Sequence, residues 1–540
     1  MKGDEAHTPA WGGRVVFDSG PFSARTQALL SFLLVATVII LYSPLLQFPF
    51  VQDDWVAIHF FRFHNLATIL ADTFSPAGKL FYRPAGNLYC WLIYALFGLH
   101  PVGFHIVSII LLLASSFLVV SVAGTLTGNQ RVAWGSGFLY AAAANVHLDP
   151  LMWMVGVIDI GAGLCALLCI GSFLKNRFGS SALWFALAMG FKESAAMLLF
   201  VLAAWTLLDR SGPSGELSLT RRLFTMLKWH SVAFLALVLL KFQGVSLFTL
   251  PVTDRYAARL IGDHIGNNFR LFAMAGVQAV ASLKGVVFSE NGALMTLFIV
   301  TAALVLVFIA GIRHLDLREK ELGRPLAVTI FVLVWFLLML FPSLTLETHF
   351  NRYYLTAALP PLVIGTMLVV KVTLLNAAVR GRFILYAMIA FVVANAIDGG
   401  VLLYRRAGLG TQDGIHASGK DGDNHLIRKA SIVREVWKPL LEVLPSIPPH
   451  SLLLLDGVET RCFEDACGPR VWYGDSTLLV TNAVAGDPDS TGMLHAAITR
   501  DDSAGSPVGP EEIAFPASRT VHVRQAGGKI EVVRGGYRTE

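Results

Sequence analysis

The chain has 540 residues, of which 55% are hydrophobic and only 15% are charged, and its mean hydropathy is +0.61. These proportions exclude an ordinary soluble protein. After residue 407 there are 13 basic and 18 acidic residues, which leaves 29 and 19 before it. We therefore expect a membrane-embedded body with a soluble C-terminal part. The excess of Lys and Arg in the body is interpreted as basic loops that set the membrane topology, not as a site for nucleic acid.

Apolar runs near the length needed to cross about 30 Å of hydrocarbon recur along the body. They cover residues 26–45, 102–124, 131–146, 152–174, 180–191, 193–208, 231–249, 291–312, 326–345, 353–371 and 383–403. The first run continues through Leu41 and Pro44 without a small-residue cleavage site, so we expect an uncleaved anchor after a cytoplasmic tail of residues 1–25. The sequence predicts a polytopic α-helical membrane domain over residues 26–404, with about eleven transmembrane helices.

Loop charge sets the expected orientation. With a cytoplasmic N-terminus, the short basic loops around 175–177, 210–228, 313–324 and 380–382 all lie on the cytoplasmic side. Residues 84–99 and 269–288 are apolar but short, and counting either one as a span would reverse this pattern. We therefore expect both to be helices at the outer interface, which places the loop 47–101 and the residues after 405 outside.

Two polar motifs lie in the first external loop. Asp53 and Asp54 are adjacent, so one carboxylate can face a cavity as a general base while the other caps or orients; a solvated helix N-cap is the plainer interpretation. Lys79, Tyr82 and Arg83 precede Pro84, and an arginine beside a helix N-terminus can hold an anion. Snorkelling to lipid phosphate explains the same residues equally well.

A third motif joins two predicted spans. We expect residues 145–150 to form an external hairpin, in which His147 and Asp149 either contact a substrate or simply close a turn. Asp159 lies farther on, inside an apolar helix, where a turn does not explain it. Buried ionisable groups in membrane helices need a partner or a function.

Two further motifs break apolar runs. Lys192 and Glu193 interrupt residues 180–208, a run that is too long for one ordinary span at 1.5 Å per residue, so we expect a helix break with both charges at a recessed outer site. An internal Lys–Glu pair is the alternative. The turn near residue 350 gathers an acid, a histidine, an arginine and two tyrosines, and from it we select His349, Arg352 and Tyr353.

Under this topology all five motifs lie on the outer face. Together they predict one polar cavity at lipid level, lined by carboxylates and cations. Such a cavity suits a substrate with an anionic headgroup and a hydrocarbon tail, reached from the bilayer.

The C-terminal part begins with a Gly-rich, charged connector over residues 405–430. Residues 431–540 then show an amphipathic helix at 431–444, a strand at 451–456 and strand-like runs at 477–481 and 519–533. They predict a small extracytoplasmic α/β or α+β domain. Cys462 and Cys467 lie in it, and the sequence leaves open whether they form a disulfide.

The order of these motifs resembles that of the GT-C membrane glycosyltransferases. An acidic pair, a long external loop, then "YRP", "NVHLDPLMWMVGVID", "FKES" and "NRYYLTAALPP" follow one another over about residues 26–375. The chain is most similar to protein O-mannosyltransferases, including the tetratricopeptide-containing transmembrane kind, and to lipid A aminoarabinose transferases. It differs in having Asp-Asp where the family usually has Asp-Glu, and in lacking tetratricopeptide repeats at its end.

The resemblance implies transfer of a sugar from a polyprenyl-phosphate donor to a hydroxyl acceptor on a protein, lipid or glycan, mostly with inversion, in a membrane that we expect to be the bacterial inner membrane. It implies that the acidic pair, Asp53 and Asp54, supplies the base, for which we favour Asp53, while the Asp-Asp sequence leaves the division of roles between the two open. It also implies that cations hold the donor phosphate: Arg83, Lys192, Arg352 and Lys79. The remaining candidates would contact substrate: Tyr82, His147, Asp149, Asp159, Glu193, His349 and Tyr353. The sequence does not decide whether a divalent metal takes part.

Two other functions remain open from the sequence. A ligase or polymerase of lipid-linked glycans would use related lipid substrates. A secondary transporter would also place polar groups inside a helical bundle, although near the midplane and between repeated halves, and the polar groups here collect on one face.

The orientation can be tested directly. A reporter that is active only outside the cytoplasm, fused after Glu540, is expected to be active, because eleven crossings from a cytoplasmic N-terminus end outside. The matched cytoplasmic reporter should be silent at this position, and activity of the cytoplasmic reporter would contradict the eleven-span topology.

Overall fold

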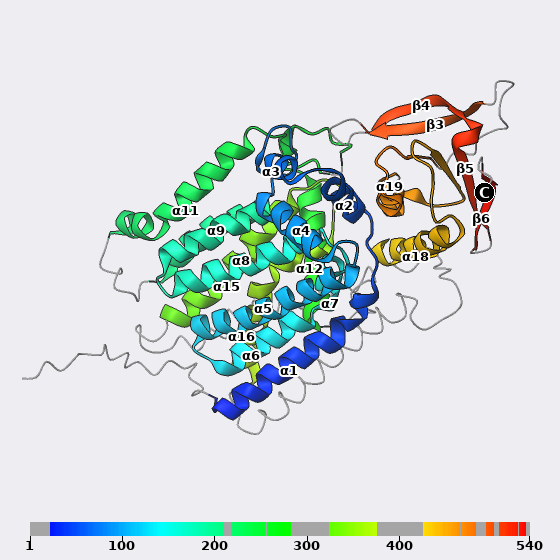
Figure 1. Ribbon diagram of the computed structural model, residues 1–540. Helices are drawn as coiled ribbons and strands as arrows, with labels where there is room; N and C mark the ends of the chain where they lie inside the picture. Colours follow the sequence, from blue (N-terminus) through cyan, green and yellow to red (C-terminus); the bar gives the residue numbers. More distant parts are fainter. Residues whose placement is uncertain are drawn as a thin grey trace, which may run out of the picture.

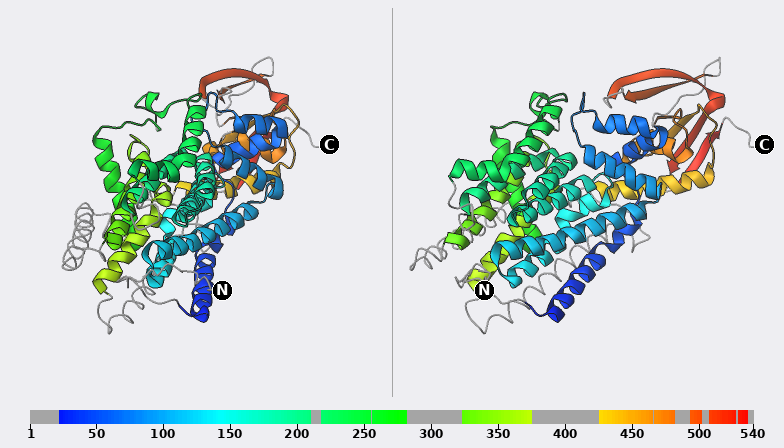
Figure 2. Two further views of the ribbon diagram at one scale, coloured as in Figure 1. Left: turned by 90° about the vertical axis from the view of Figure 1, so that its left-hand side faces the viewer. Right: turned by 60° about the vertical axis from the view of Figure 1, so that its left-hand side comes forward.

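The computed structural model describes residues 22–209, 218–254, 256–281, 323–374, 425–464, 466–481, 493–501, 507–526 and 529–535. In these residues a large helical bundle is followed by a smaller domain that contains a β-sheet (Figure 1). The two views in Figure 2 show the smaller domain next to α2, at one end of the bundle.

Five helical segments of the described chain are long and apolar enough to cross a membrane. They are Ala24–Gln47 (α1, Ala24–Tyr42, with η1, Ser43–Gln47), α5 (Pro101–Thr127), α8 (Val157–Leu174), α11 (Leu219–Lys241) and Leu326–Leu344 in α15 (Gly323–Leu344). Shorter apolar helices are α9 (Phe178–Phe191), Glu193–Leu208 (η2, Glu193–Met197, with α10, Leu198–Leu208) and Leu359–Lys371 in α16 (Leu359–Leu374). Length and composition therefore make the chain an integral membrane protein.

Most of the predicted runs overlap these helices, but α11 begins at Leu219, inside the expected basic loop 210–228, and ends at Lys241, before the end of the run 231–249. The runs 291–312 and 383–403 lie outside the described residues, so the total of eleven spans remains a prediction. The run 131–146 corresponds to α6 (Gln130–Ala142), which is followed at once by α7 (Ala144–Met152).

The predicted hairpin at 145–150 is wrong, because these residues form α7. His147 is fully buried there, and its Nε2 lies 2.8 Å from the carbonyl oxygen of Tyr140 near the end of α6. The same carbonyl also accepts from the backbone N–H of Ala143 at 3.3 Å, so the imidazole makes a second hydrogen bond to it and joins the two helices.

The segment predicted to be the first external loop, residues 47–101, contains α2 (Asp53–Phe63), α3 (Leu66–Phe74) and α4 (Pro84–Phe97). The expected short helix at 84–99 is therefore present, with Pro84 at its first position, where the missing N–H costs nothing. The other expected short helix, at 269–288, overlaps α12 (Asp263–Ala281), and residues 282–288 lie outside the described chain.

Small residues bring the start of α4 against the end of α9. A Cβ built on Gly190 would lie 3.0 Å from the Cβ of Ala85, and one on Gly86 would lie 2.9 Å from the Cγ1 of Ile158. Bulkier residues would push the helices apart. The chain then leaves the helical conformation at Lys192, whose φ and ψ are −151° and 132°, before η2 begins at Glu193, so the predicted break is present.

The smaller domain consists of α18 (His425–Val443), η6 (Thr460–Phe463), α19 (Cys467–Tyr473) and two sheets. One sheet has the order β2-β1-β5-β6, formed by Leu479–Thr481, Leu452–Asp456, Thr520–Ala526 and Lys529–Gly535; β1 is parallel to β2 and β5, and β6 is antiparallel to β5. The other is the antiparallel pair β3 (Met493–Asp501) and β4 (Pro507–Pro516).

One detail differs from the expectations for this domain, and one question that the sequence left open is answered. Helix α18 begins at His425, inside the range expected to be a connector. Cys462 and Cys467 are both free thiols.

Candidate active site

The acidic pair begins α2. Gln52, just before it, has a φ of 55° and a ψ of −127°, a backbone conformation that residues other than glycine rarely adopt. Strain of this kind is of order 1–3 kcal/mol and persists only where the surroundings impose it, as they do at many functional sites. Both acids lie in the first turn, where the helix dipole favours negative charge.

The two carboxyl groups have different surroundings. Asp54 is 1% exposed, and its two oxygens accept hydrogen bonds from the backbone N–H groups of Val51, at 3.1 Å, and Val155, at 3.2 Å. Asp53 is partly exposed. Burial raises the pKa of Asp54 to about 8, although its backbone hydrogen bonds act in the opposite direction. Asp54 therefore ties the first loop to the connection between α7 and α8.

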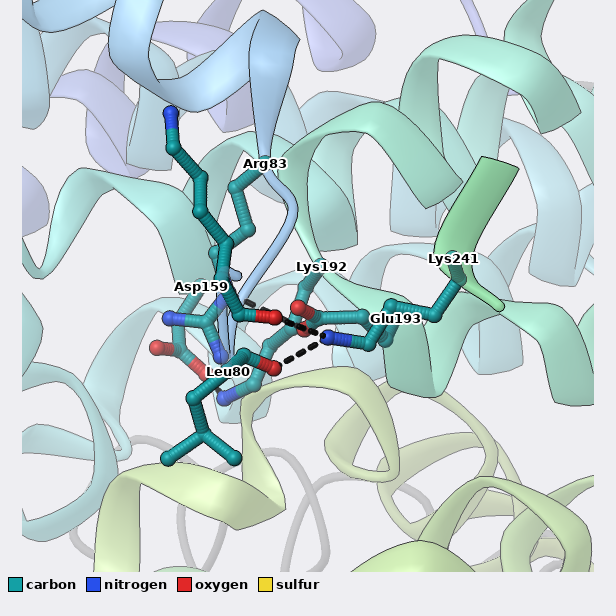
Figure 3. Close-up of polar contacts among 7 residues, drawn as sticks. Leu80, Arg83, Asp159, Lys192, Glu193 and Lys241 are labelled. Atoms are coloured by element: carbon teal, nitrogen blue, oxygen red, sulfur yellow. Dashed lines mark hydrogen bonds and ion pairs between the residues drawn. The ribbon is translucent and has the colours of Figure 1, made fainter. Parts of the chain in front are cut away.

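A cluster of five charged side chains, the charge cluster, lies where the segment before α4 meets the α9 break (Figure 3). Arg83 Nε donates to Glu193 Oε2 at 3.0 Å, and Lys192 Nζ is paired with Asp159 Oδ1 from the first turn of α8. The side chains of Lys192 and Asp159 are only 13% and 12% exposed. Charges buried to this degree are costly unless they are paired.

Lys241 is the fifth member of the charge cluster. Its Nζ donates to the backbone carbonyls of Lys79, at 3.2 Å, and Leu80, so the end of α11 holds the segment that leads to Arg83 (Figure 3). Burial disfavours the charged form of such groups unless they have partners. The cluster has three cations and two carboxylates. It therefore carries a net positive charge of one when all five are ionised.

Aromatic rings surround the cations. Arg83 lies 4.3 Å from the centroid of Phe81, and Lys192 lies 4.5 Å from that of Tyr354 and 5.5 Å from that of Tyr353. Ring faces are electronegative, so these contacts stabilise cations in an apolar setting. The charge cluster is thus lined on two sides by aromatic groups.

The connection between α7 and α8 links Asp54 of the acidic pair to the charge cluster. Val155 in this connection binds Asp54, and Asp159 follows one turn later. Trp153, in the same connection, lies with its ring centroid 6.3 Å from that of Tyr353, which contacts Lys192. One short segment therefore contacts both groups.

The structure brings together only some of the predicted site residues. Arg83, Asp159, Lys192, Glu193 and Tyr353 lie in or against the charge cluster, and His349 lies next to it, with its ring centroid 5.8 Å from that of Tyr354.

Other predicted residues have different surroundings. Lys79 Nζ pairs with Asp72 at 2.9 Å, and the hydroxyl of Tyr82 donates to the carbonyl of Phe74 at 3.4 Å, so both brace α3. Three more predicted residues lie in other elements: His147 and Asp149 in α7, and Arg352 at the start of η5 (Arg352–Ala357).

Sequence reasoning missed Lys241, Phe81 and Trp153. Lys241 was hidden inside the apolar run 231–249, although a lone lysine at that depth is itself a signal for a partner. In the described part of the chain, no group of three or more His, Cys, Asp or Glu side chains is arranged to hold a metal ion.

No family model matches the chain. It is 34% identical over 106 residues to protein O-mannosyl-transferase Tmtc2 of Drosophila melanogaster, and 28% identical over 179 residues to protein O-mannosyl-transferase TMTC2 of Homo sapiens. These matches cover 19% and 31% of this chain, but only 11% and 21% of the respective relatives. The predicted resemblance to protein O-mannosyltransferases is confirmed over that part of the sequence.

Among the solved structures with similar chains are a bacterial and an archaeal one. ArnT from Cupriavidus metallidurans, bound to undecaprenyl phosphate, aligns with a TM-score of 0.48 and 13% identity, covering 86% of this chain and 87% of that one. The archaeal oligosaccharyltransferase AglB from Archaeoglobus fulgidus, with an inhibitory peptide and a dolichol-phosphate, aligns with a TM-score of 0.41 and 12% identity over 72% of this chain and 59% of that one.

The different surroundings of the two acids predict different effects on stability. Asn at position 54 offers a single acceptor oxygen, so the N–H of Val51 or Val155 would face an NH2 group. We expect Asp54→Asn to lower the free energy of unfolding by about 1–3 kcal/mol, and Asp53→Asn to lower it less. Thermal unfolding of both variants in the same detergent measures the difference, and equal stabilities would contradict the assignment of Asp54 as the buried link.

Proposed function

We propose that the protein is a membrane glycosyltransferase of the GT-C type, which transfers a sugar from a polyprenyl-phosphate donor to a hydroxyl acceptor at the outer face. Asp53 is the general base, and the cations of the charge cluster hold the donor phosphate. The observation that carries the proposal is the contact of one segment, residues 153–159, with both Asp54, the neighbour of Asp53, and the charge cluster.

The reaction forms one bond and breaks another. The acceptor hydroxyl attacks the anomeric carbon and transfers its proton to Asp53. The bond between that carbon and the phosphate oxygen breaks, and its electron pair leaves with the polyprenyl phosphate. Attack from the side opposite the phosphate inverts the anomeric centre.

The charge cluster suits the leaving group. Negative charge on the phosphate grows in the transition state, and preorganised cations stabilise such charge most effectively away from water. Arg83, Lys192 and Lys241 supply three cations. Glu193 orients Arg83, Asp159 orients Lys192, and backbone carbonyls of the segment before Arg83 orient Lys241. One carboxylate oxygen, Glu193 Oε1, is buried without a partner in the described residues, so this pair is open to rearrangement when a phosphate arrives.

Asp53 and Asp54 have different roles in this proposal. A base needs a carboxylate that can reach substrate, and Asp54 is enclosed by protein with both oxygens engaged. Asp53 is adjacent and partly exposed, and these features support the assignment of the base to the first acid of the pair.

Replacement of the base is the first test. Asp53→Asn is expected to lower turnover of a polyprenyl-phosphate sugar by about 10²- to 10⁴-fold, the range that general-base catalysis contributes, while the protein still folds and binds donor. Release of free polyprenyl phosphate from a panel of such donors measures turnover. Near-normal release by the variant would remove Asp53 as the base.

Removal of a cation is the second test. Arg83→Ala is expected to raise the KM for the donor about 10- to 100-fold, since a hydrogen bond to a charged group contributes about 1.5–3 kcal/mol, and to leave acceptor KM nearly unchanged. Lys228→Ala, which removes an exposed cation from α11, is the matched control.

Arg83→Ala also leaves Glu193 without its partner, so a second variant separates the two effects. The double variant Arg83→Ala/Glu193→Gln removes the unpaired charge. If Arg83 binds phosphate, the double variant keeps the high donor KM; recovery of a normal KM would show that Arg83 only neutralises Glu193.

A further inference from the structure

The loop that carries the acidic pair is held from outside the bundle. The backbone N–H of Gln52 donates to the carbonyl of Cys462 in η6, at 2.9 Å. This bond fixes the residue with the strained backbone, immediately before Asp53. Cys462 is fully buried, so the bond is shielded from water.

An aromatic contact holds the other side of the pair. Trp55 is fully buried, and its ring meets Trp437 of α18 edge-on at 5.0 Å and Trp472 of α19 at 5.6 Å. Trp437 and Trp472 are stacked on each other, with centroids 6.0 Å apart and ring planes 11° apart. The indole Nε1 of Trp55 donates to the carbonyl of Phe50 at 3.1 Å, which fixes the orientation of its ring.

A third contact lies at the start of the loop. Arg434 of α18 donates to the carbonyl of Gln47 at 2.6 Å, and its guanidinium lies 5.8 Å from the ring centroid of Phe48. Three separate elements of the smaller domain, α18, η6 and α19, therefore contact residues 47–55 on both sides of Asp53.

We propose that the C-terminal domain is a positioning element for Asp53, and that Trp472, Trp437 and Arg434 are positioning residues which act on the base through the loop 47–55. This inference rests on the proposed function for its effect on turnover, but its structural part stands alone. A base must be placed within a fraction of an ångström of its productive position, and a displacement of about 1 Å can lower the rate about 100-fold.

The test compares Trp472→Ala with Trp472→Phe in the full-length protein. The alanine variant removes the ring that contacts Trp55, whereas the phenylalanine variant keeps an aromatic ring. Arg524→Ala is the control, because Arg524 belongs to the same domain but pairs with Asp456 within the sheet, at 2.7 Å.

The first measurement is deuterium uptake by peptides covering residues 47–56, which does not depend on activity. We expect faster uptake in Trp472→Ala and wild-type uptake in Trp472→Phe and Arg524→Ala. Wild-type uptake in Trp472→Ala would overturn the proposal. If that variant does not fold, Arg434→Ala, which deletes a contact at the surface, takes its place against Arg434→Lys.

The second measurement is turnover as a function of pH, with a polyprenyl-phosphate sugar. We expect Trp472→Ala to lower kcat about 10- to 100-fold with an unchanged donor KM, and to shift the acid limb of the kcat profile, since the base has changed its surroundings. Trp472→Phe should restore both. A profile that is only scaled down would indicate a smaller folded fraction and would overturn the positioning role.

The two proposals fail in different ways. If the wild-type protein turns over no donor in the panel, the proposed function fails, while deuterium uptake still decides whether the domain holds the loop. If the wild type is active and Trp472→Ala has wild-type uptake and kcat, only the positioning role fails.

Discussion

The pairing of Lys192 with Asp159 inside an apolar bundle is the interaction on which the arrangement of the site depends. Each of these charges would be strongly disfavoured alone at that depth. Their partnership requires α9 to end at Phe191 and Asp159 to face the break from the first turn of α8. Since α4 packs against the same break through Gly86 and Gly190, Arg83 arrives beside Glu193, and a second pair forms next to the first.

Charge pairing of this kind stabilises the buried side chains and leaves one cation in excess. The five groups of the charge cluster satisfy one another incompletely, with one more cation than carboxylate. Under the proposed function, a donor phosphate would be neutralised by groups that are already in place, without the cost of moving charges from water. The surrounding rings of Phe81, Tyr353 and Tyr354 keep the cations in an environment of low polarity.

Much of the site follows from the sequence, because charges inside apolar runs are conspicuous. Asp159 and the break at Lys192 could be located from hydropathy alone, and Pro84 marked the start of α4. His147 could not be placed correctly, because a Pro-containing polar stretch between apolar runs is typical of a turn. Its buried bond to Tyr140 links two successive helices, and a local pattern does not predict such a contact. Lys241 and the stacked tryptophans depend on contacts between distant segments, which local patterns do not encode.

The hydrogen bond from Gln52 to Cys462 joins residues near opposite ends of the printed sequence. During synthesis the bundle helices enter the membrane long before α18, η6 and α19 leave the ribosome, because chains fold from the N-terminal side. Until then Trp55 has no indole partners, and the acidic pair lies on a loop without its outer support. A much later segment of the chain therefore completes the support of the loop 47–55, and a nascent chain carries its acids without that support until α18, η6 and α19 have been translated.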